Sequence, residues 1–497
     1  MAEPAHAAHT LVREVRVEPD GPMCDVRLSG GRVASIRPAG EPADGARVVD
    51  GRGGTLLPGL VDAHAHMAQW AAARRRVSLA AAGSAAEAAG LVAAAVGTAA
   101  GDGRGPVVFG AHFSDGLWPD RPHKDLLERA VPGHPVALFS NDLHACWLSP
   151  AALALVGRGD HPTGVFVDTE CMEITAALPQ ASTETQDRWV LDATHEAAAR
   201  GVTGVIDFEY TDTVVDWTRR LAAGTPSVRV ACTVARPVLD AAIERGHRTG
   251  DPVAGSAGLL EVGPFKLFVD GSLNTRTAYC HDPYPGEDGT GQLVTAPEEL
   301  VALMRRAAGH GVLPAVHAIG DLAAAIALDA FAEVGCRGRI EHAQLLSPGD
   351  VRRFAELGVT AGVQPAHAPD DRDVADRYWA GRTGRAFAYA ALLAAGARLE
   401  IGSDAPVSPL DPWRGIAAAV TRTADERPPW HAEQAIPVEA ALAAASAGRD
   451  RVRAGDRADL VVTGADPRRV PPAELPHLPI VATLLAGRPT YVADGWS

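Results

Sequence analysis

Two histidines, His64 and His66, stand one residue apart at the end of the apolar run "LLPGLVDAHAHM", which covers residues 56–67. Alternate side chains of a β-strand point to the same face, so a strand here would direct both imidazoles to one point. Two converging neutral imidazoles are suited to binding a divalent transition metal. The alternative is that two histidines fall near a strand end by chance, and these twelve residues alone leave both interpretations open.

A lysine stands within another apolar segment, "GPFKLFVDGS", at residues 263–272. On a strand, Lys266 would share one face with Phe268 and Asp270, and the opposite face would be apolar. Burying an ammonium group is costly unless its charge is paired or neutralised. A lysine is therefore unusual at this position, and Lys266 is a candidate for a catalytic or metal-binding role.

Three more polar side chains end apolar segments further along the chain. His317 lies in "LPAVHAIG", His342 in "RIEHAQ" and Asp404 in "RLEIGSDAP". Each of these residues taken alone is more often a cap or a hydrogen-bonded core group. Together with His64 and His66 they form a set of potential metal ligands and proton carriers, provided that the fold brings the ends of their strands together.

The order of the apolar segments predicts such a fold. Eight short apolar strands are mostly separated by segments of helical length, such as residues 297–311 and 322–335. This α/β alternation is typical of a TIM-type (β/α)8 barrel, whose active site lies at the carboxyl ends of the strands. The predicted strands are residues 59–66, 201–208, 228–234, 263–271, 313–320, 339–344, 359–365 and 398–406.

Two further parts are expected around the predicted barrel, which we place at residues 58–444. About 135 residues separate the first predicted strand from the second, and this stretch has strands and helices of its own. We therefore predict an inserted subdomain at about residues 70–195. Short alternating strands with turn residues recur at both ends of the chain, and they predict one small β-sandwich domain built from residues 1–57 and 445–497.

Composition limits the expected partners and location. The 497 residues carry a formal net charge of −15, and no basic stripe is present to offset phosphate repulsion, so we expect no nucleic-acid partner. The Arg74-Arg75-Arg76 run is flanked by alanine, and we interpret it as a solvated helix face. We expect no membrane span and no signal peptide. The six cysteines are scattered without a CxxC pair, which favours free thiols and a cytoplasmic location.

The motifs taken together resemble the amidohydrolase superfamily. The shared pattern is HxH after the first strand, lysine on the fourth, histidine on the fifth and sixth, and aspartate on the eighth. The phrases "KLFVDGSLNTRTA", "HAIGD", "RIEHAQ", "VQPAH" and "GSDAPVSPLDPW" are similar to its YtcJ-like branch, also called amidohydrolase family 3. So are "SDGLWPDRPHKDLLERAVPGHPVALFSNDLHACWLSPAAL" and "RVRAGDRADLVV", and the resemblance covers nearly the whole chain.

Two departures from the branch lie on the expected substrate side. The chain has Asp142-Leu143-His144 where the branch usually has Asp-Gly-His. It has Asp168, in "TGVFVD", where the branch usually has the acidic residue of "TGVLRE".

The resemblance implies a site for one or two divalent metal ions, with zinc expected ahead of iron or manganese. His64 and His66 would bind the more buried ion together with Asp404. His317 and His342 would bind the second ion.

The resemblance also implies that Lys266 is carboxylated on its side-chain nitrogen and bridges the two ions. A carbamate is an anion with two oxygens, which would explain a lysine in an apolar strand. The alternative, an unmodified amine beside a single metal ion, stays open. Asp404 would be the catalytic residue that takes a proton from the attacking water and passes it to the leaving nitrogen.

The implied activity is hydrolysis of amide-type carbon–nitrogen bonds, with an N-substituted formamide as the favoured substrate. The expected partners are a small-molecule substrate and a second copy of the chain in a homodimer. The predicted substrate-binding residues are His144, Trp118, Asp270, Arg276 and His367. Two alternatives stay open, namely ester hydrolysis or decarboxylation at the same metal site, and a non-catalytic barrel that binds a ligand.

Overall fold

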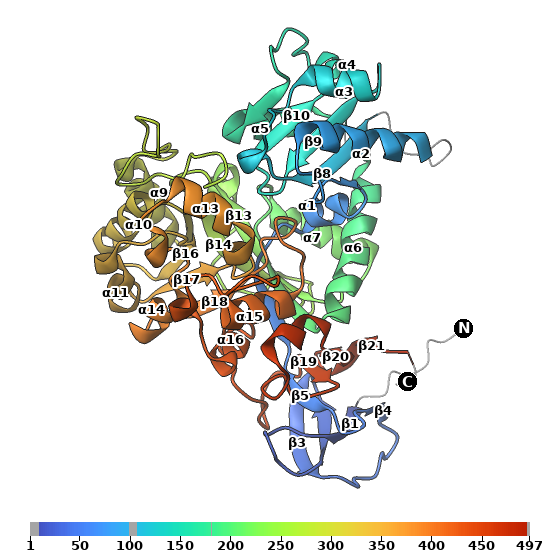
Figure 1. Cartoon of the computed structure of the whole chain (residues 1–497). Helices are drawn as coiled ribbons and strands as arrows, with labels where there is room; N and C mark the ends of the chain where they lie inside the picture. The colour runs from blue at the N-terminus through green and yellow to red at the C-terminus, as the bar shows by residue number, and fades with distance from the viewer. Residues whose placement is uncertain (1–8, 99–106, 180, 495–497) are drawn as a thin grey trace.

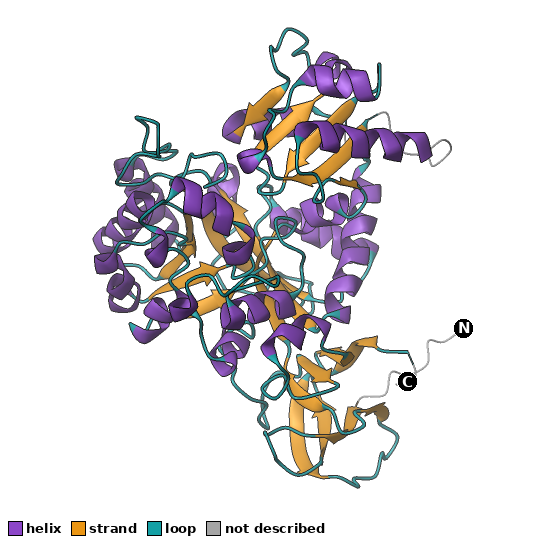
Figure 2. Ribbon diagram, viewed as in Figure 1, coloured by secondary structure: helices purple, strands orange, loops and turns teal. Residues whose placement is uncertain are grey.

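The structure, a computed structural model, describes residues 9–98, 107–179 and 181–494. Its parts follow one another in space, with an inserted subdomain at one end, a barrel in the middle and a small β domain at the other end (Figure 1). Helices surround the strands of the barrel (Figure 2). None of the helices in the described ranges combines the length and apolar character that crossing a membrane requires.

The central sheet of the described chain has eight parallel strands in the order β18-β17-β16-β15-β14-β13-β12-β6. An isolated parallel bridge between Ala65 and Ala405 joins the chain after β18 to β6 and brings the two edges of the sheet together. The predicted TIM-type barrel is therefore confirmed, and each observed strand overlaps one predicted strand. The strands are β6 (Leu60–Ala65), β12 (Val202–Asp207), β13 (Arg229–Ala235), β14 (Leu260–Phe268), β15 (Pro314–Ala318), β16 (Gly338–His342), β17 (Val359–Val363) and β18 (Leu399–Ile401).

Helices of the barrel follow the strands and cover their outer faces. In α9 (Pro297–Gly309), a proline occupies the first turn, where a missing N–H costs nothing, and two glutamates favour the positive end of the helix dipole. Leu300, Met304 and Ala307 of this helix recur at helical spacing and are buried. The other helices are α7 (Thr213–Ala223), α8 (Leu239–Glu244), α10 (Asp321–Val334), α11 (Pro348–Leu357), α12 (His367–Asp370), α13 (Arg372–Tyr378), α14 (Tyr389–Ala394), α15 (Pro412–Thr421) and α16 (Val438–Ala444).

Strand β14 shows how the core orients the polar residues. Phe265 and Leu267 are buried in the large apolar cluster that also contains Met304 and Leu328 of the outer helices. Because side chains alternate along a strand, Lys266 points to the opposite side of the sheet, into the barrel. The apolar packing of its neighbours thus fixes the direction of the lysine.

The inserted subdomain has its own sheet, in the order β11-β10-β9-β8-β7, and its own apolar clusters. By contrast, α1 (Met67–Ala73) and α6 (Thr183–Ala199) pack with β12 in a barrel cluster that contains Trp70, Val190 and Val205. We therefore propose that the insertion is shorter than residues 70–195. Residues 99–106 and 180, which fall within the predicted insertion, lie outside the described ranges. Its elements are β7 (Val77–Ser78), α2 (Ala85–Thr98), β8 (Val108–Phe113), α3 (Lys124–Ala130), β9 (Val136–Ser140), β10 (Ala145–Leu148), α4 (Pro150–Leu155), β11 (Val165–Val167) and α5 (Asp168–Ala177).

The β domain combines strands from both ends of the chain, as the sequence predicted. One sheet has the order β3-β2-β1-β4 and the other β21-β20-β19-β5, and β5 pairs antiparallel with β19. Val12, Leu56 and Leu460 share one apolar cluster. The predicted boundaries of this domain, at residues 57 and 445, stay predictions. Residues 1–8 and 495–497 lie outside the described ranges. The strands are β1 (His9–Val15), β2 (Cys24–Ser29), β3 (Arg32–Pro38), β4 (Arg47–Asp50), β5 (Thr55–Pro58), β19 (Leu460–Thr463), β20 (Ile480–Leu485) and β21 (Arg488–Val492).

The shared core of the β domain makes a testable prediction. Leu460 is fully buried in it, so Leu460→Ala should lower the free energy of unfolding by about 2–5 kcal/mol through the cavity that it leaves. Hydrogen–deuterium exchange should then become faster in both β1–β3 and β19–β21, because these strands depend on one core. As a control, Leu155→Ala removes a half-exposed side chain and should change stability by less than about 0.5 kcal/mol. Faster exchange in only one terminal segment would contradict the shared core.

Candidate active site

A cavity of about 550 Å³ opens between the carboxyl ends of the barrel strands and the inserted subdomain. Barrel strands, the loops that follow them, helix α1 and subdomain residues all contribute to its wall. The cavity brings together all of the residues that the resemblance named as metal ligands. They are His64, His66, Lys266, His317, His342 and Asp404.

His64, near the end of β6, is held by a buried carboxylate. Its Nδ1 donates a hydrogen bond to Oε2 of Glu341 (2.7 Å), and Arg339 pairs with the same carboxylate. Burial and the positive charge of Lys266 lower the pKa of His64 well below its usual value, so the imidazole is neutral. With Nδ1 donating, the lone pair of Nε2 is free to act as a ligand.

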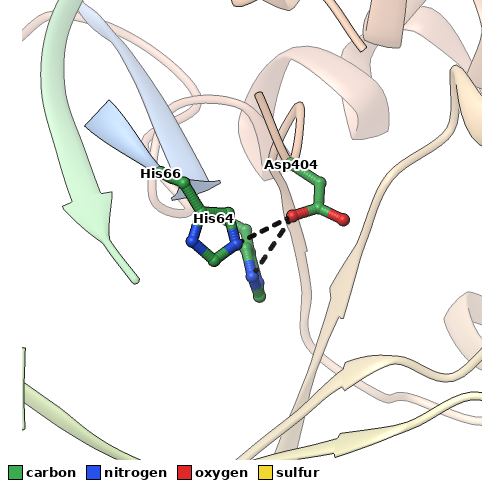
Figure 3. Close-up of side chains that lie close together, drawn as sticks. All are labelled: His64, His66 and Asp404. Carbon is green, nitrogen blue, oxygen red and sulfur yellow. Dashed lines mark ion pairs between the residues drawn. The ribbon is translucent and has the colours of Figure 1, made fainter. Parts of the chain in front are cut away.

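His66 and Asp404 complete the group around His64 (Figure 3). Oδ1 of Asp404 lies 3.2 Å from Nε2 of His66 and 3.5 Å from Nε2 of His64. Burial disfavours the charged carboxylate, but the two histidines outweigh it and hold the pKa of Asp404 well below its usual range. The backbone of Asp404 has a positive φ of 57°, a conformation that is uncommon outside glycine and that turns the side chain toward β6.

His342, at the end of β16, belongs to a second group. Its ligand atom lies within 4.8 Å of those of His367 and Asp404. Its Nδ1 donates to Oε1 of Gln364 (3.0 Å), which fixes the ring. The sequence led us to expect His317 as the partner of His342, with His367 among the substrate-binding residues. In the structure His367 lies in this group of three and His317 does not.

His317, on β15, nevertheless faces the same cavity. Its ring centroid lies 4.5 Å from that of His342. Nε2 donates to the carbonyl of Gly271 (3.1 Å), so Nδ1 is left as the acceptor nitrogen. Burial, together with the positive charge of Lys266, lowers the pKa of His317 to about 3 and keeps the ring neutral.

Lys266 lies at the bottom of this arrangement and is almost fully buried. Its Nζ is 4.8 Å from the ring centroids of both Phe208 and Phe268. Burial lowers its pKa to about 8, although Glu341 and Asp404 act in the opposite direction. A lysine with a lowered pKa has a larger neutral fraction near neutral pH, which is the form that can react with carbon dioxide.

His144 reaches the cavity from the inserted subdomain. Its Nδ1 donates to Oδ1 of Asp168 (2.6 Å) at the start of α5. Burial opposes protonation of His144, but this hydrogen bond outweighs burial and raises its pKa to about 9. Each of the two phrases in which the chain departs from the branch pattern thus contributes one residue to a charged pair, of which His144 lines the cavity.

The donor set fits a divalent transition metal. In the part of the chain that the structure describes, two groups could hold an ion: His64, His66 and Asp404, and His342, His367 and Asp404. The Nε2 atoms of His64 and His367 are buried and have no hydrogen-bond partner among the described residues. Buried nitrogens without a partner are rare in folded proteins, and a metal ion would satisfy them. Imidazole and carboxylate are the ligands that zinc, iron and manganese accept.

Comparison with known proteins identifies the family of this chain. Residues 47–491 match the model of the amidohydrolase family. The chain belongs to the amidohydrolase family. It is 30% identical over 411 residues to YtcJ of Bacillus subtilis (strain 168), which is named as an amidohydrolase, and the match covers 76% of each chain.

Two further similarities extend over nearly the whole amidohydrolase chain. It is 26% identical to the N-substituted formamide deformylase of Arthrobacter pascens, over 95% of each protein. The crystal structure of an uncharacterized metal-dependent hydrolase from Pyrococcus horikoshii OT3 superposes with a TM-score of 0.76 at 24% identity. That superposition covers 93% of this chain and 98% of the other, and it supports the fold assignment.

Three predicted substrate-binding residues of the amidohydrolase lie outside the cavity lining. Trp118 packs in the subdomain core and donates from Nε1 to the carbonyl of Ala82 (3.1 Å). Asp270 is buried and accepts backbone hydrogen bonds, among them one from Gly320 N (2.8 Å), so it ties two barrel loops together. Arg276 pairs with Glu287 (2.8 Å). Local structure occupies the polar groups of these three residues, and their role in substrate binding stays a prediction.

Several site residues were missed at the sequence level. Glu341 orients His64, and Gln364 orients His342. The sequence did contain a signal for Glu341, because Arg339 and Glu341 stand two residues apart on a short buried strand and so share one face. Phe208 stacks on His64 with 4.0 Å between ring centroids, but nothing distinguishes it from an ordinary core residue in the sequence.

The His144–Asp168 pair predicts a measurable titration. Asp168→Asn should lower the pKa of His144 from about 9 toward its ordinary value of about 6.5, because burial is then opposed mainly by the charge of Asp142. In the native chain, the pair contributes its full stabilisation below pH about 6.5, and this contribution is lost as the pH rises through about 9. Histidine side-chain NMR measures the titration. Glu170→Gln is the matched control, since it removes a charge from the same helix turn. An unchanged pKa in Asp168→Asn would show that the pair does not set the charge of His144.

Proposed function

We propose that this amidohydrolase cleaves carbon–nitrogen bonds of amide type, other than peptide bonds, with the help of one or two divalent metal ions. The observation that carries the proposal is the convergence of the six candidate ligands on one cavity, with buried Nε2 atoms that lack hydrogen-bond partners among the described residues. A ligand-binding barrel without catalysis would have no use for this donor set. The cytoplasmic location and the homodimer stay predictions.

The chain would hold the metal through side chains from several strands. His64, His66 and Asp404 would bind one ion, and His342 would bind the second together with His317 or His367. A bound divalent metal, with zinc foremost, supplies Lewis acidity and lowers the pKa of water toward neutrality. Glu341 would raise the basicity of His64 and keep its Nε2 aimed at the ion.

Asp404 would carry the proton. Its carboxylate is ionised at neutral pH, and it lies at the centre of both groups of three side chains. It can therefore accept a proton from the attacking water and deliver it to the leaving nitrogen. The backbone N–H of Asp404 donates to the carbonyl of His64 (2.7 Å), which holds this residue beside both groups.

His144 would bind the substrate carbonyl oxygen. Its Nδ1 is taken by Asp168, and Nε2 is left to donate toward the cavity that His144 lines. A pKa of about 9 keeps the ring protonated at neutral pH, so it can stabilise developing negative charge. His367 is the second candidate for this role if it does not bind metal.

An N-substituted formamide is the substrate class that we favour. A similar protein, from Arthrobacter pascens, is named for deformylation of such compounds. Apolar side chains form part of the cavity wall, among them Met172, Trp189 and Val407. A small acyl group could thus lie at the metal ligands while an apolar nitrogen substituent fills the remaining space. A panel of formamides, other amides and esters would test the assignment, and turnover of esters alone would overturn it.

Metal dependence is the next prediction. The double variant His64→Ala/His66→Ala should lose activity and most of the bound metal, because two of the three ligands of one group are removed. Elemental analysis of purified protein and turnover of the panel are the measurements. His310→Ala, which changes an exposed histidine at the end of α9, is the matched control. Full turnover in the double variant would show that the site is misassigned.

Lys266 gives a separate prediction. Lys266→Ala should lose activity and regain part of it when a short-chain carboxylate such as acetate is added, because the carboxylate can replace the carbamate as a bridge. Lys266→Arg should not be rescued, since its fixed charge fills the space and repels the metal ions. Equal behaviour of the two variants with acetate would contradict the bridging role and would favour an unmodified amine.

A further inference from the structure

The three consecutive arginines after α1 have different surroundings. Arg74 is exposed and pairs with Glu196 (3.2 Å), and Arg75 is exposed and pairs with Asp192 (3.4 Å). Both fit the solvated helix face that the sequence predicted. Arg76 does not, because it is half-buried and lines the active-site cavity.

The guanidinium of Arg76 rests on aromatic rings and has no counterion among the described residues. It lies 4.6 Å from the ring centroid of Phe139 and 5.6 Å from that of Phe109. Within the described ranges, no carboxylate forms an ion pair with it and no acceptor takes a hydrogen bond from its side chain. Burial lowers its pKa to about 10, even though Glu209 acts in the opposite direction. A desolvated guanidinium without a partner is unfavourable, and an anion in the cavity would compensate it.

Arg76 lines the same cavity as the metal ligands, and it follows the C-terminal end of α1 whereas His66 lies at the N-terminal end. His66, Gln69, Ala72 and Arg76 follow one another along α1 and the turns after it, and all four line the cavity. The seven residues of α1, which separate His66 from Arg76, rise roughly 10 Å along the helix axis. A substrate that contacts both His66 and Arg76 would therefore need an extended substituent.

The acid that acts on the pKa of Arg76 is already engaged. Glu209 accepts hydrogen bonds from the backbone N (2.7 Å) and the side-chain Nε2 (3.2 Å) of Gln69. His112 is the other titratable group that faces Arg76, and burial, reinforced by the charge of Arg76, lowers its pKa. Neither group neutralises the guanidinium by direct contact.

We propose that Arg76 binds a carboxylate at the far end of the substrate, so that the preferred substrates are amides with a long apolar nitrogen substituent ending in an anionic group. The planar fork of the guanidinium matches the two oxygens of a carboxylate, and the aromatic surface beneath it holds its orientation. Arg76 is then a specificity-determining residue. The proposal rests on the proposed amide hydrolysis for the nature of the reacting group, but not for the anion site itself.

A matched pair of ligands tests the anion site without any turnover. Calorimetry on the full-length purified protein should show that ω-aminooctanoate binds about tenfold or more tightly than neutral ω-aminooctanamide. Arg76→Met keeps a long apolar side chain on Phe139 and should remove this preference, whereas Arg76→Lys should keep part of it. Arg75→Met removes an exposed charge next to the cavity and should leave the preference unchanged. Thermal unfolding of each variant checks that the fold is intact.

The corresponding substrates, N-formyl-ω-aminooctanoate and its primary amide, extend the test to catalysis. The carboxylate should raise kcat/KM about tenfold or more in the native chain, through KM, and Arg76→Met should lose this advantage while still cleaving the neutral amide. Failure to cleave either compound would contradict the proposed function and leave the calorimetric result to decide the anion site. A carboxylate preference that survives in Arg76→Met, or that is absent in the native chain, would overturn the proposal.

Discussion

The active site depends on the closure of the barrel between its first and last strands. Beyond β18, the N–H of Asp404 donates to the carbonyl of His64 (2.7 Å), and the N–H of His66 donates to Ala405 (2.8 Å). The chains approach so closely here that a Cβ at position 402 would lie 2.8 Å from the Cβ of His64, and only glycine fits. These backbone contacts place the carboxylate of Asp404 beside both imidazoles. The metal-binding group is therefore a consequence of closing the sheet.

A network of buried charged side chains keeps the closed site in one arrangement. Arg339 joins Glu341 to Glu400 on β18 (2.8 Å) and also donates to the carbonyl of Ala63 on β6 (3.1 Å). The same Glu341 holds Nδ1 of His64. Breaking such a buried network by removing one partner leaves an uncompensated charge, so the network strongly favours a single geometry. The positive φ values at His342 (74°) and at Asp404 (57°) are further strain that persists only where the surroundings impose it.

The sequence predicted the parts of this account that depend on regular periodicity. Alternation of apolar strands with helices predicted the barrel, and polar residues at strand ends predicted the candidate ligands. Contacts between side chains on different strands of the barrel were harder to predict. The position of His367 beside His342, and the role of Glu341 under His64, arise from side chains on different strands whose spacing in sequence has no fixed meaning. Trp118 has an aromatic side chain of the kind that lines pockets, and in the structure it packs against the subdomain core, so its role in substrate binding stays a prediction.

The surroundings of Arg76 are another feature that the sequence did not predict. Arg74, Arg75 and Arg76 are identical as residue types, and their surroundings differ because the turn after α1 places only Arg76 against Phe109 and Phe139 of the inserted subdomain. The insertion thus does more than cover the barrel, since it supplies His144 near the ligands and Phe139 beneath Arg76. Substrate choice would then be set mainly by the insertion, and the chemistry by the barrel.

The most direct test of the central claim is crystallographic anomalous scattering measured at the absorption edges of zinc, iron and manganese on the purified protein. The account predicts an anomalous peak at about 2.0–2.2 Å from Nε2 of His64 and a carboxylate oxygen of Asp404, with His66 as a further ligand. Metal bound elsewhere in the chain, with His64, His66 and Asp404 bonded only to one another, would contradict it.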